Sequence, residues 1–179
     1  MAFTSQLART LDDLDEQIGA EENGDRKLQT ILDRYLLEIE GASDRDVRTS
    51  VLLLDSERKR LMHGAAPSLP KEYCSAIDGL VIGPSAGSCG TAAYMGHSIF
   101  VTDVATDPLW TDFRDLALEH GLQSCWSTPI RSDDDEVIGT FAIYHLAARA
   151  PTEDEILAVK GIGGQVARAI TRWSECGAV

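Results

Sequence analysis

The chain has 179 residues, of which 44% are hydrophobic and 25% are charged. This length suits one domain with a sizeable core, and the composition excludes global disorder and leaves no room for a second catalytic domain of ordinary length. The 16 Lys and Arg residues against 29 Asp and Glu residues give a formal net charge of -13 at pH 7, which repels a phosphate backbone and disfavours nucleic acid as a partner.

Two amphipathic helices are predicted at the start of the chain. Apolar residues recur at alternating spacings of four and three within 7–18 and again within 28–39, which places each set on one helical stripe. The polar segment 19–24 separates the two helices, and Gly41 ends the second. We therefore expect an N-terminal helix and linker over 1–24, a folded domain over 25–173 and a short tail over 174–179.

The next part of the chain alternates strands with short helices. Residues 47–54 and 61–65 predict a β-hairpin, and Pro70 is suited to the first turn of a short helix. The stretch 79–90 is rich in Gly, Ser and Pro and predicts a loop, while 90–95 predicts a helical turn that Gly96 ends.

The C-terminal half begins with a strand at 98–103 and a helix that starts at Asp107, continues through Ala117 and is stopped by Gly121. Residues 124–131 and 137–146 are rich in strand-forming residues and flank an acidic turn, so they predict an antiparallel hairpin. A capped, acidic entry at 151–155 then leads into a long amphipathic helix that ends near Trp173.

This order of elements predicts an α+β fold with a mainly antiparallel central sheet. The N- and C-terminal helices are expected to cover one face of the sheet. Loops and short helices from 67–121 are expected to cover the other face and to leave a cleft for a small ligand. The cleft is where we expect function to reside.

Several segments in this order resemble the GAF family of bacterial signalling proteins. They are GSCGTAA at 87–93, IFVTDVATDPLW at 99–110, GLQSCWSTPI at 121–130 and VIGTFAIY at 137–144, followed by the helix entry PTEDE at 151–155. The resemblance implies a sensory or regulatory domain that binds a small molecule and alters the output of a histidine kinase, a nucleotide cyclase or a transcription activator. It also implies a homodimer built from the terminal helices. It does not name the ligand.

The apolar stripes on the first and last predicted helices allow two interpretations of that dimer. Each stripe either packs on the core of its own domain or forms a seam with a second copy. If the stripes only dimerise and the cleft is filled by its own side chains, the protein is a ligand-free dimerisation module. The pattern leaves both readings open.

Candidate ligand-binding residues come from the cover and from the floor of the expected cleft. The cover supplies Ser88, Cys89, Thr91 and Tyr94. The floor supplies Cys125 and Ser127. Trp110 and Phe113 form an apolar wall. Ser88 and Thr91 have a structural alternative as caps of the short helix, and Trp110 and Phe113 as core residues. Asp103 is expected to fix the turn after its strand, and Asp107 to cap the helix that follows.

The enzymatic alternative is a thiol chemistry like that of free methionine-(R)-sulfoxide reductases, which share the GAF fold. Cys89 in SCGTAA matches one cysteine motif of that family, but Gly79 and Leu118 lie near the positions where its other cysteines are expected. Cys125 then remains as a second thiol, and both thiols are either redox-active or buried structural residues. We expect a binding module and not an enzyme.

Other cofactors find little support in the sequence. The four cysteines and four histidines form no zinc-ligand spacing, and His97 or His120 as a haem ligand would rest on a lone histidine. The Asn-Lys start of the signature of cyclic-nucleotide-binding GAF domains is missing after Tyr144, and we find no bilin-attachment context. With no apolar run approaching the roughly 18 residues of a membrane span, we expect a cytoplasmic protein with no membrane partner.

Overall fold

The computed structural model describes residues 28–43 and 46–176. Within these ranges one six-stranded sheet forms the centre of the fold, with strand order β3-β2-β1-β6-β5-β4. All neighbouring strands pair antiparallel, as the sequence predicts. The strands are β1 (Val47–Leu54), β2 (Arg60–Ala65), β3 (Leu80–Val81), β4 (Ile99–Val101), β5 (Ser124–Arg131) and β6 (Val137–His145).

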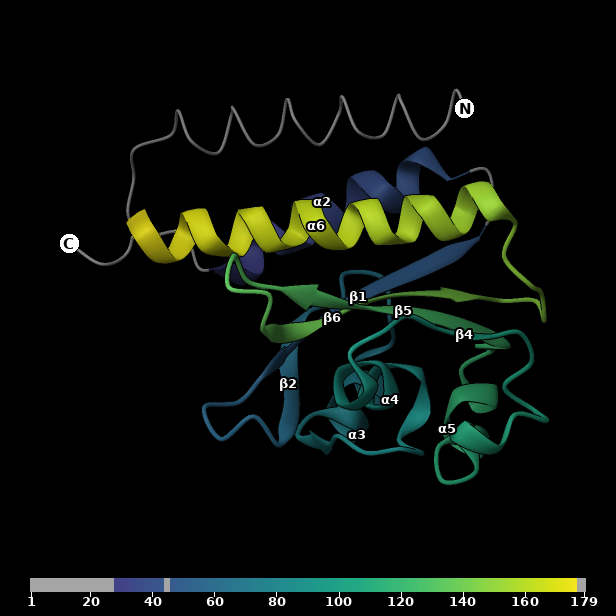
Figure 1. The fold of residues 1–179 in the computed structure, drawn as a ribbon. Coiled ribbons are helices and arrows are strands. Elements are labelled where there is room, and N and C mark those ends of the chain that lie inside the picture. The colour runs from purple at the N-terminus through teal and green to yellow at the C-terminus, as the bar shows by residue number, and fades with distance from the viewer. Residues whose placement is uncertain (1–27, 44–45, 177–179) are drawn as a thin grey trace.

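Helices cover both faces of this sheet (Figure 1). Two long helices, α2 (Leu28–Ala42) and α6 (Glu153–Cys176), lie together on one face. The opposite face carries four short helical elements: α3 (Lys71–Ile77), α4 (Gly87–Met95), the 3-10 helix η1 (Pro108–Trp110) and α5 (Arg114–Glu119). The predicted α+β class and the placement of the helices are therefore confirmed.

The two faces bury separate cores because side chains alternate along each strand. On β5, Trp126 belongs to the cluster under α2 and α6, whereas its neighbour Cys125 belongs to the cluster under the short helices. On β6, Phe141 and Tyr144 divide in the same way. The central strands thus contact the helical layer with one row of side chains and the cover with the next.

The predicted loop at 79–90 is wrong at both of its ends. Leu80 pairs with Leu61 of β2 and starts β3, and α4 begins at Gly87, three residues before the predicted turn. Low helix propensity is overridden here by close packing, because a Cβ at Gly90 would lie only 2.6 Å from the Cβ of Ala86. The end of α4 is as expected, with Gly96 in the left-handed region at φ +70°.

The single helix predicted from Asp107 to Ala117 is instead divided into η1 and α5. Asp107 caps η1 as expected, since its carboxylate accepts a hydrogen bond of 2.9 Å from the amide of Leu109. The chain then leaves helical geometry before α5, and Arg114 fixes this break by donating to the carbonyls of Val104 and Asp107. The residues between η1 and α5 still make backbone turns, from the amide of Thr111 to the carbonyl of Pro108 and from the amide of Phe113 to the carbonyl of Trp110.

The predicted helix at 7–18 lies outside the described residues. At the other end of the chain, α6 continues to Cys176 and so extends beyond the expected end near Trp173. In the part of the chain that the structure describes, no helix is both long and apolar enough to cross a membrane.

Candidate functional site

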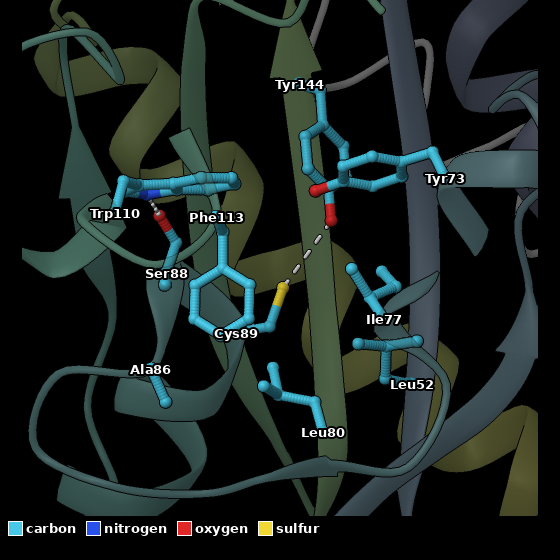
Figure 2. Close-up of a pocket in the computed structure, with 11 residues that line it drawn as sticks. Leu52, Tyr73, Ile77, Leu80, Ala86, Ser88, Cys89, Trp110, Phe113 and Tyr144 are labelled. Atoms are coloured by element: carbon cyan, nitrogen blue, oxygen red, sulfur yellow. Dashed lines mark hydrogen bonds between the residues drawn. The ribbon is translucent and has the colours of Figure 1, made fainter. Parts of the chain in front are cut away.

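A small pocket lies between the sheet and its cover (Figure 2). Its walls come from β1, β6, β3, α3, α4 and the segment around η1, and they are mostly apolar. The cavity measures about 20 Å³, which is room for one or two water-sized molecules. The cleft expected from the sequence is therefore present, but side chains almost fill it.

Ser88 joins three elements at the edge of the pocket. Its hydroxyl donates a hydrogen bond of 3.0 Å to the carbonyl of Cys125 and accepts one of 3.1 Å from the indole nitrogen of Trp110. Ser88 is fully buried, and Figure 2 shows its contact with Trp110. The hydroxyl consequently ties α4 to β5 and η1, and does not cap α4.

Cys89 follows Ser88 in the first turn of α4 and lies in a cluster of hydrogen-bonding groups. Its sulfur is 3.7 Å from the hydroxyl of Tyr144, and Figure 2 shows the two atoms pointing toward each other. A hydrogen bond from the Cys125 thiol, joined by bonds from side chains that include Ser127, lowers the pKa of Cys89 to about 7 in spite of its burial. The cluster therefore favours the thiolate of Cys89.

The other groups of this cluster stay protonated. Burial raises the pKa of Cys125 well above its ordinary value, and the neighbouring Cys89 raises it further. Burial likewise raises the pKa of the hydroxyls of Tyr73 and Tyr144, whose rings meet edge to face at 5.9 Å. Around Cys89 the site thus presents hydrogen-bond donors and one ionisable sulfur.

The structure brings most of the predicted site residues together. Ser88, Cys89, Trp110 and Phe113 all line the pocket. Trp110 is at the same time a core residue with 3% of its surface exposed, so both readings hold for it.

Three further predicted residues lie just outside the pocket wall. Cys125 and Ser127 are fully buried on β5; the carbonyl of Cys125 accepts a hydrogen bond from the pocket residue Ser88, and the hydroxyl of Ser127 donates one to the carbonyl of Phe141. Thr91 is also buried, and its hydroxyl accepts a hydrogen bond of 3.1 Å from the amide of Ala86. This contact holds the start of α4, but Thr91 is not the expected cap, because Ala86 occupies the N-cap position and α4 has no side-chain cap.

Tyr94 is a correction, because its side chain is 55% exposed and does not line the pocket. It lies five positions after Cys89, which is roughly 140° around an α-helix. Tyr94 therefore points away from the sheet, because Cys89 on the same helix points toward it.

Sequence reasoning missed Tyr73 and Tyr144, the two phenols of the site. Tyr144 is the cross-strand partner of Cys125, so the expected hairpin of 124–131 with 137–146 could have found it if its register had been known. Tyr73 stands one helical turn before Ile77, another pocket residue, which is a weak signal for a buried helix face. Within the described residues, no group of three or more His, Cys, Asp or Glu side chains could hold a metal ion.

Comparison with known families gives a match to the GAF domain over residues 25–171. The chain belongs to the GAF domain family. Over 107 residues this GAF domain is 43% identical to the methyl sulfide methyltransferase-associated sensor of Methanosarcina acetivorans. The match covers 60% of this chain but only 11% of that sensor, so the chain spans a small part of its relative's length.

Solved structures show the same GAF fold. A domain assigned to a two-component sensor histidine kinase of Sinorhizobium meliloti aligns with a TM-score of 0.68 at 22% identity, covering 83% of this chain and 94% of that one. The free methionine-R-sulfoxide reductase of Neisseria meningitidis, solved with its substrate, aligns with a TM-score of 0.70 at 16% identity, covering 96% and 92%. At these identities both likenesses establish the fold alone.

Proposed function

We propose that this GAF domain is the sensory module of a signal-transduction protein and that it relays the state of its pocket to α2 and α6. The observation that carries the proposal is the shared sheet. Adjacent residues of β5 face opposite ways, Cys125 into the cluster around the pocket and Trp126 into the core under the helices. The match to the sensor of Methanosarcina acetivorans supports the same reading.

A second connection joins α2 to the cover. The carboxylate of Glu40 in α2 accepts hydrogen bonds of 2.7 Å from the amide and hydroxyl of Thr49 in β1, and it also accepts one from the hydroxyl of Ser68. Ser68 lies in the segment that leads into α3, and α3 supplies Tyr73 to the pocket. A displacement of α3 would therefore be transmitted to α2 through the charge-assisted hydrogen bond between Ser68 and Glu40.

We further propose that α2 and α6 form a homodimer and pass the signal to an output domain such as a histidine kinase or a nucleotide cyclase, as in a two-component system. Much of the apolar surface of these helices packs on the sheet, but Leu37 of α2 and Leu157 of α6 are 51% and 65% exposed. The exposed leucines on α2 and α6 supply apolar surface for a second copy.

The size of the pocket limits how it could sense a ligand. A cavity of about 20 Å³ admits a very small molecule directly, whereas a larger metabolite requires the cover to move outward. In either case, the ligand must bind one arrangement of cover and helices more tightly than the other in order to shift their populations.

Native mass spectrometry of freshly purified protein is the first test, because one spectrum reports the oligomeric mass and any retained small molecule. Molecules that are retained, or that raise the melting temperature in a screen, are then titrated while hydrogen exchange is followed in α2 and α6. Phe113→Ala changes the pocket wall, and Tyr94→Ala, on the exposed side of α4, is the matched control.

A ligand that protects α2 and α6 in the wild type and in Tyr94→Ala, but binds Phe113→Ala more weakly, supports the sensor. If no screened molecule binds and the dimer constant is the same under every condition, the chain acts as a ligand-free dimerisation module. Turnover of free methionine sulfoxide with a thiol reductant, lost in the double variant Cys89→Ser and Cys125→Ser, would instead establish a thiol enzyme.

A further inference from the structure

We propose that Cys89 and Cys125 form a peroxide-oxidised dithiol, in which hydrogen peroxide enters the pocket and the two thiols end as an intramolecular disulfide between α4 and β5. The signalling consequence rests on the proposed sensory function, but the chemistry does not. The proposal adds a chemical input at the site already described, and it concerns residues of this chain alone.

The first argument is the way in which the fold joins the two thiols. They are far apart in sequence, yet both side chains are buried in the same cluster on the cover side of the sheet, and Tyr144, whose hydroxyl lies 3.7 Å from the Cys89 sulfur, is the cross-strand partner of Cys125. Ser88, the neighbour of Cys89, also bonds the backbone carbonyl of Cys125 at 3.0 Å. The first turn of α4 is thus held directly against the strand that carries the second sulfur.

The second argument is the division of roles between the sulfurs. Cys89 lines the pocket, whereas Cys125 lies behind it and is not part of the wall. The hydrogen-bond donors around Cys89 favour its thiolate, the form that attacks peroxides, and Cys125 keeps its proton until a partner sulfur is oxidised. One thiol is therefore placed to react first and the other to resolve the product.

The third argument is size. A cavity of about 20 Å³ holds one or two water-sized molecules, and hydrogen peroxide has two oxygen atoms, so it fits where an amino-acid substrate does not. The hydroxyl of Tyr144, 3.7 Å from the Cys89 sulfur, can donate a hydrogen bond to the thiolate. The pocket therefore selects a very small polar oxidant.

The reaction proceeds in two balanced steps. In the first, the Cys89 thiolate attacks one peroxide oxygen, an S–O bond forms as the O–O bond breaks, and the departing hydroxide takes a proton from solvent, equivalent to the one that Cys89 released on ionising, and leaves as water. In the second, the Cys125 sulfur attacks the resulting sulfenic acid, an S–S bond forms as the S–O bond breaks, and the departing hydroxide takes the Cys125 proton. The two sulfurs together lose two electrons, and the peroxide gains them.

The test uses the full chain with Cys74→Ser and Cys176→Ser as background, so that the pair under test supplies the remaining thiols. The folded protein is treated with increasing hydrogen peroxide, quenched, denatured and alkylated, and its intact mass and peptides are measured. We expect both thiols to be lost together at low peroxide excess, with one peptide linking Cys89 to Cys125 and with recovery by dithiothreitol.

Single variants separate the two steps. In this background Cys125→Ser should accumulate a sulfenic acid on Cys89, whereas Cys89→Ser should leave Cys125 alkylatable. Tyr144→Phe should slow the oxidation of Cys89 roughly tenfold, because the thiolate loses a hydrogen-bond donor. Tyr94→Phe, on the exposed side of α4, is the matched control and should react at the wild-type rate.

Retention of both thiols at a peroxide excess that already oxidises exposed methionines would overturn the proposal, as would a disulfide found only between two chains. Such a failure would leave the ligand screen of the proposed function unaffected. If the internal disulfide forms while hydrogen exchange in α2 and α6 stays unchanged, the chemical proposal stands and its link to signalling fails.

Discussion

Replacing two adjacent glycines of α6 by alanine tests how closely this helix lies on the sheet. A Cβ at Gly163 would lie 2.9 Å from the Cγ2 atom of Thr128, whereas a Cβ at Gly164 would have no heavy atom within 4 Å. Thr128 cannot easily yield, because it is β-branched, only 4% exposed, and its hydroxyl is 2.9 Å from that of Ser98. The same substitution therefore meets two different environments.

The expected magnitudes follow from two opposing effects. Alanine in place of glycine inside a helix stabilises it by about 1 kcal/mol. Gly164→Ala should show this gain in the free energy of unfolding, whereas Gly163→Ala should also suffer overpacking, which costs about 1–3 kcal/mol. We expect Gly163→Ala to be less stable than Gly164→Ala by about 1–3 kcal/mol, since the helix-propensity gain cancels between the two.

Urea unfolding followed by far-ultraviolet circular dichroism measures both values, at one protein concentration so that any oligomerisation affects the variants equally. Equal slopes of the free energy of unfolding against urea concentration would show that the two variants expose similar surface areas on unfolding. If Gly163→Ala gains as much stability as Gly164→Ala, α6 does not lie on β5 as closely as described, and the proposed relay from the sheet to this helix loses its basis.

Three further perturbations test other contacts. Ser88→Ala should lower the free energy of unfolding by about 1–3 kcal/mol, because the indole N–H of Trp110 stays buried and loses its hydrogen-bond acceptor. In the Trp110→Phe background the same change should cost clearly less, and equal costs would refute the hydrogen bond between Trp110 and Ser88. Asp107→Ala should cost about 1 kcal/mol through loss of the cap on η1, measured by thermal unfolding against Asp112→Ala, an exposed aspartate nearby whose removal should change stability little. Burial raises the pKa of Glu155, but hydrogen bonds from neighbouring groups outweigh this effect and leave the pKa below the ordinary 4.5. The carboxylate of Glu155 therefore stabilises the fold above pH 4.5, and this stabilisation is lost as the pH falls through the pKa of the folded state. Glu155→Gln should remove that part of the acid-dependent loss in a series of unfolding curves, and an unchanged series would contradict the assignment.

Local patterns in the sequence settle the class of the fold and the places where many elements end. Strand-forming residues on both sides of an acidic turn predict β5 and β6, and glycine after α4 predicts the end of that helix because left-handed backbone is cheap only without a Cβ. The hydrogen bond that the amide of Ala105 donates to the carboxylate of Asp103 likewise confirms the turn expected after β4. All these signals depend on a few neighbouring residues, so the sequence alone contains them.

The same is true of part of the candidate site. Cys89, Trp110 and Phe113 are recognisable because they stand in segments expected to cover the sheet, and they do line the pocket. Tyr94 is recognisable in the same way but points outward. Membership in a covering segment therefore identifies candidates, whereas the rotation of the helix decides which of them reach the pocket.

What only the tertiary structure decides is which distant groups share one buried space and how much of that space remains. Strand register places Tyr144 opposite Cys125. The close approach of a helix of small residues brings Cys89 to within 3.7 Å of the Tyr144 hydroxyl and lets Ser88 bond the carbonyl of Cys125. The hydrogen bonds and the altered acidity of Cys89 arise from that proximity. The small volume of the pocket likewise results from side chains of six separate elements meeting at one point, a property that no local pattern in the sequence encodes.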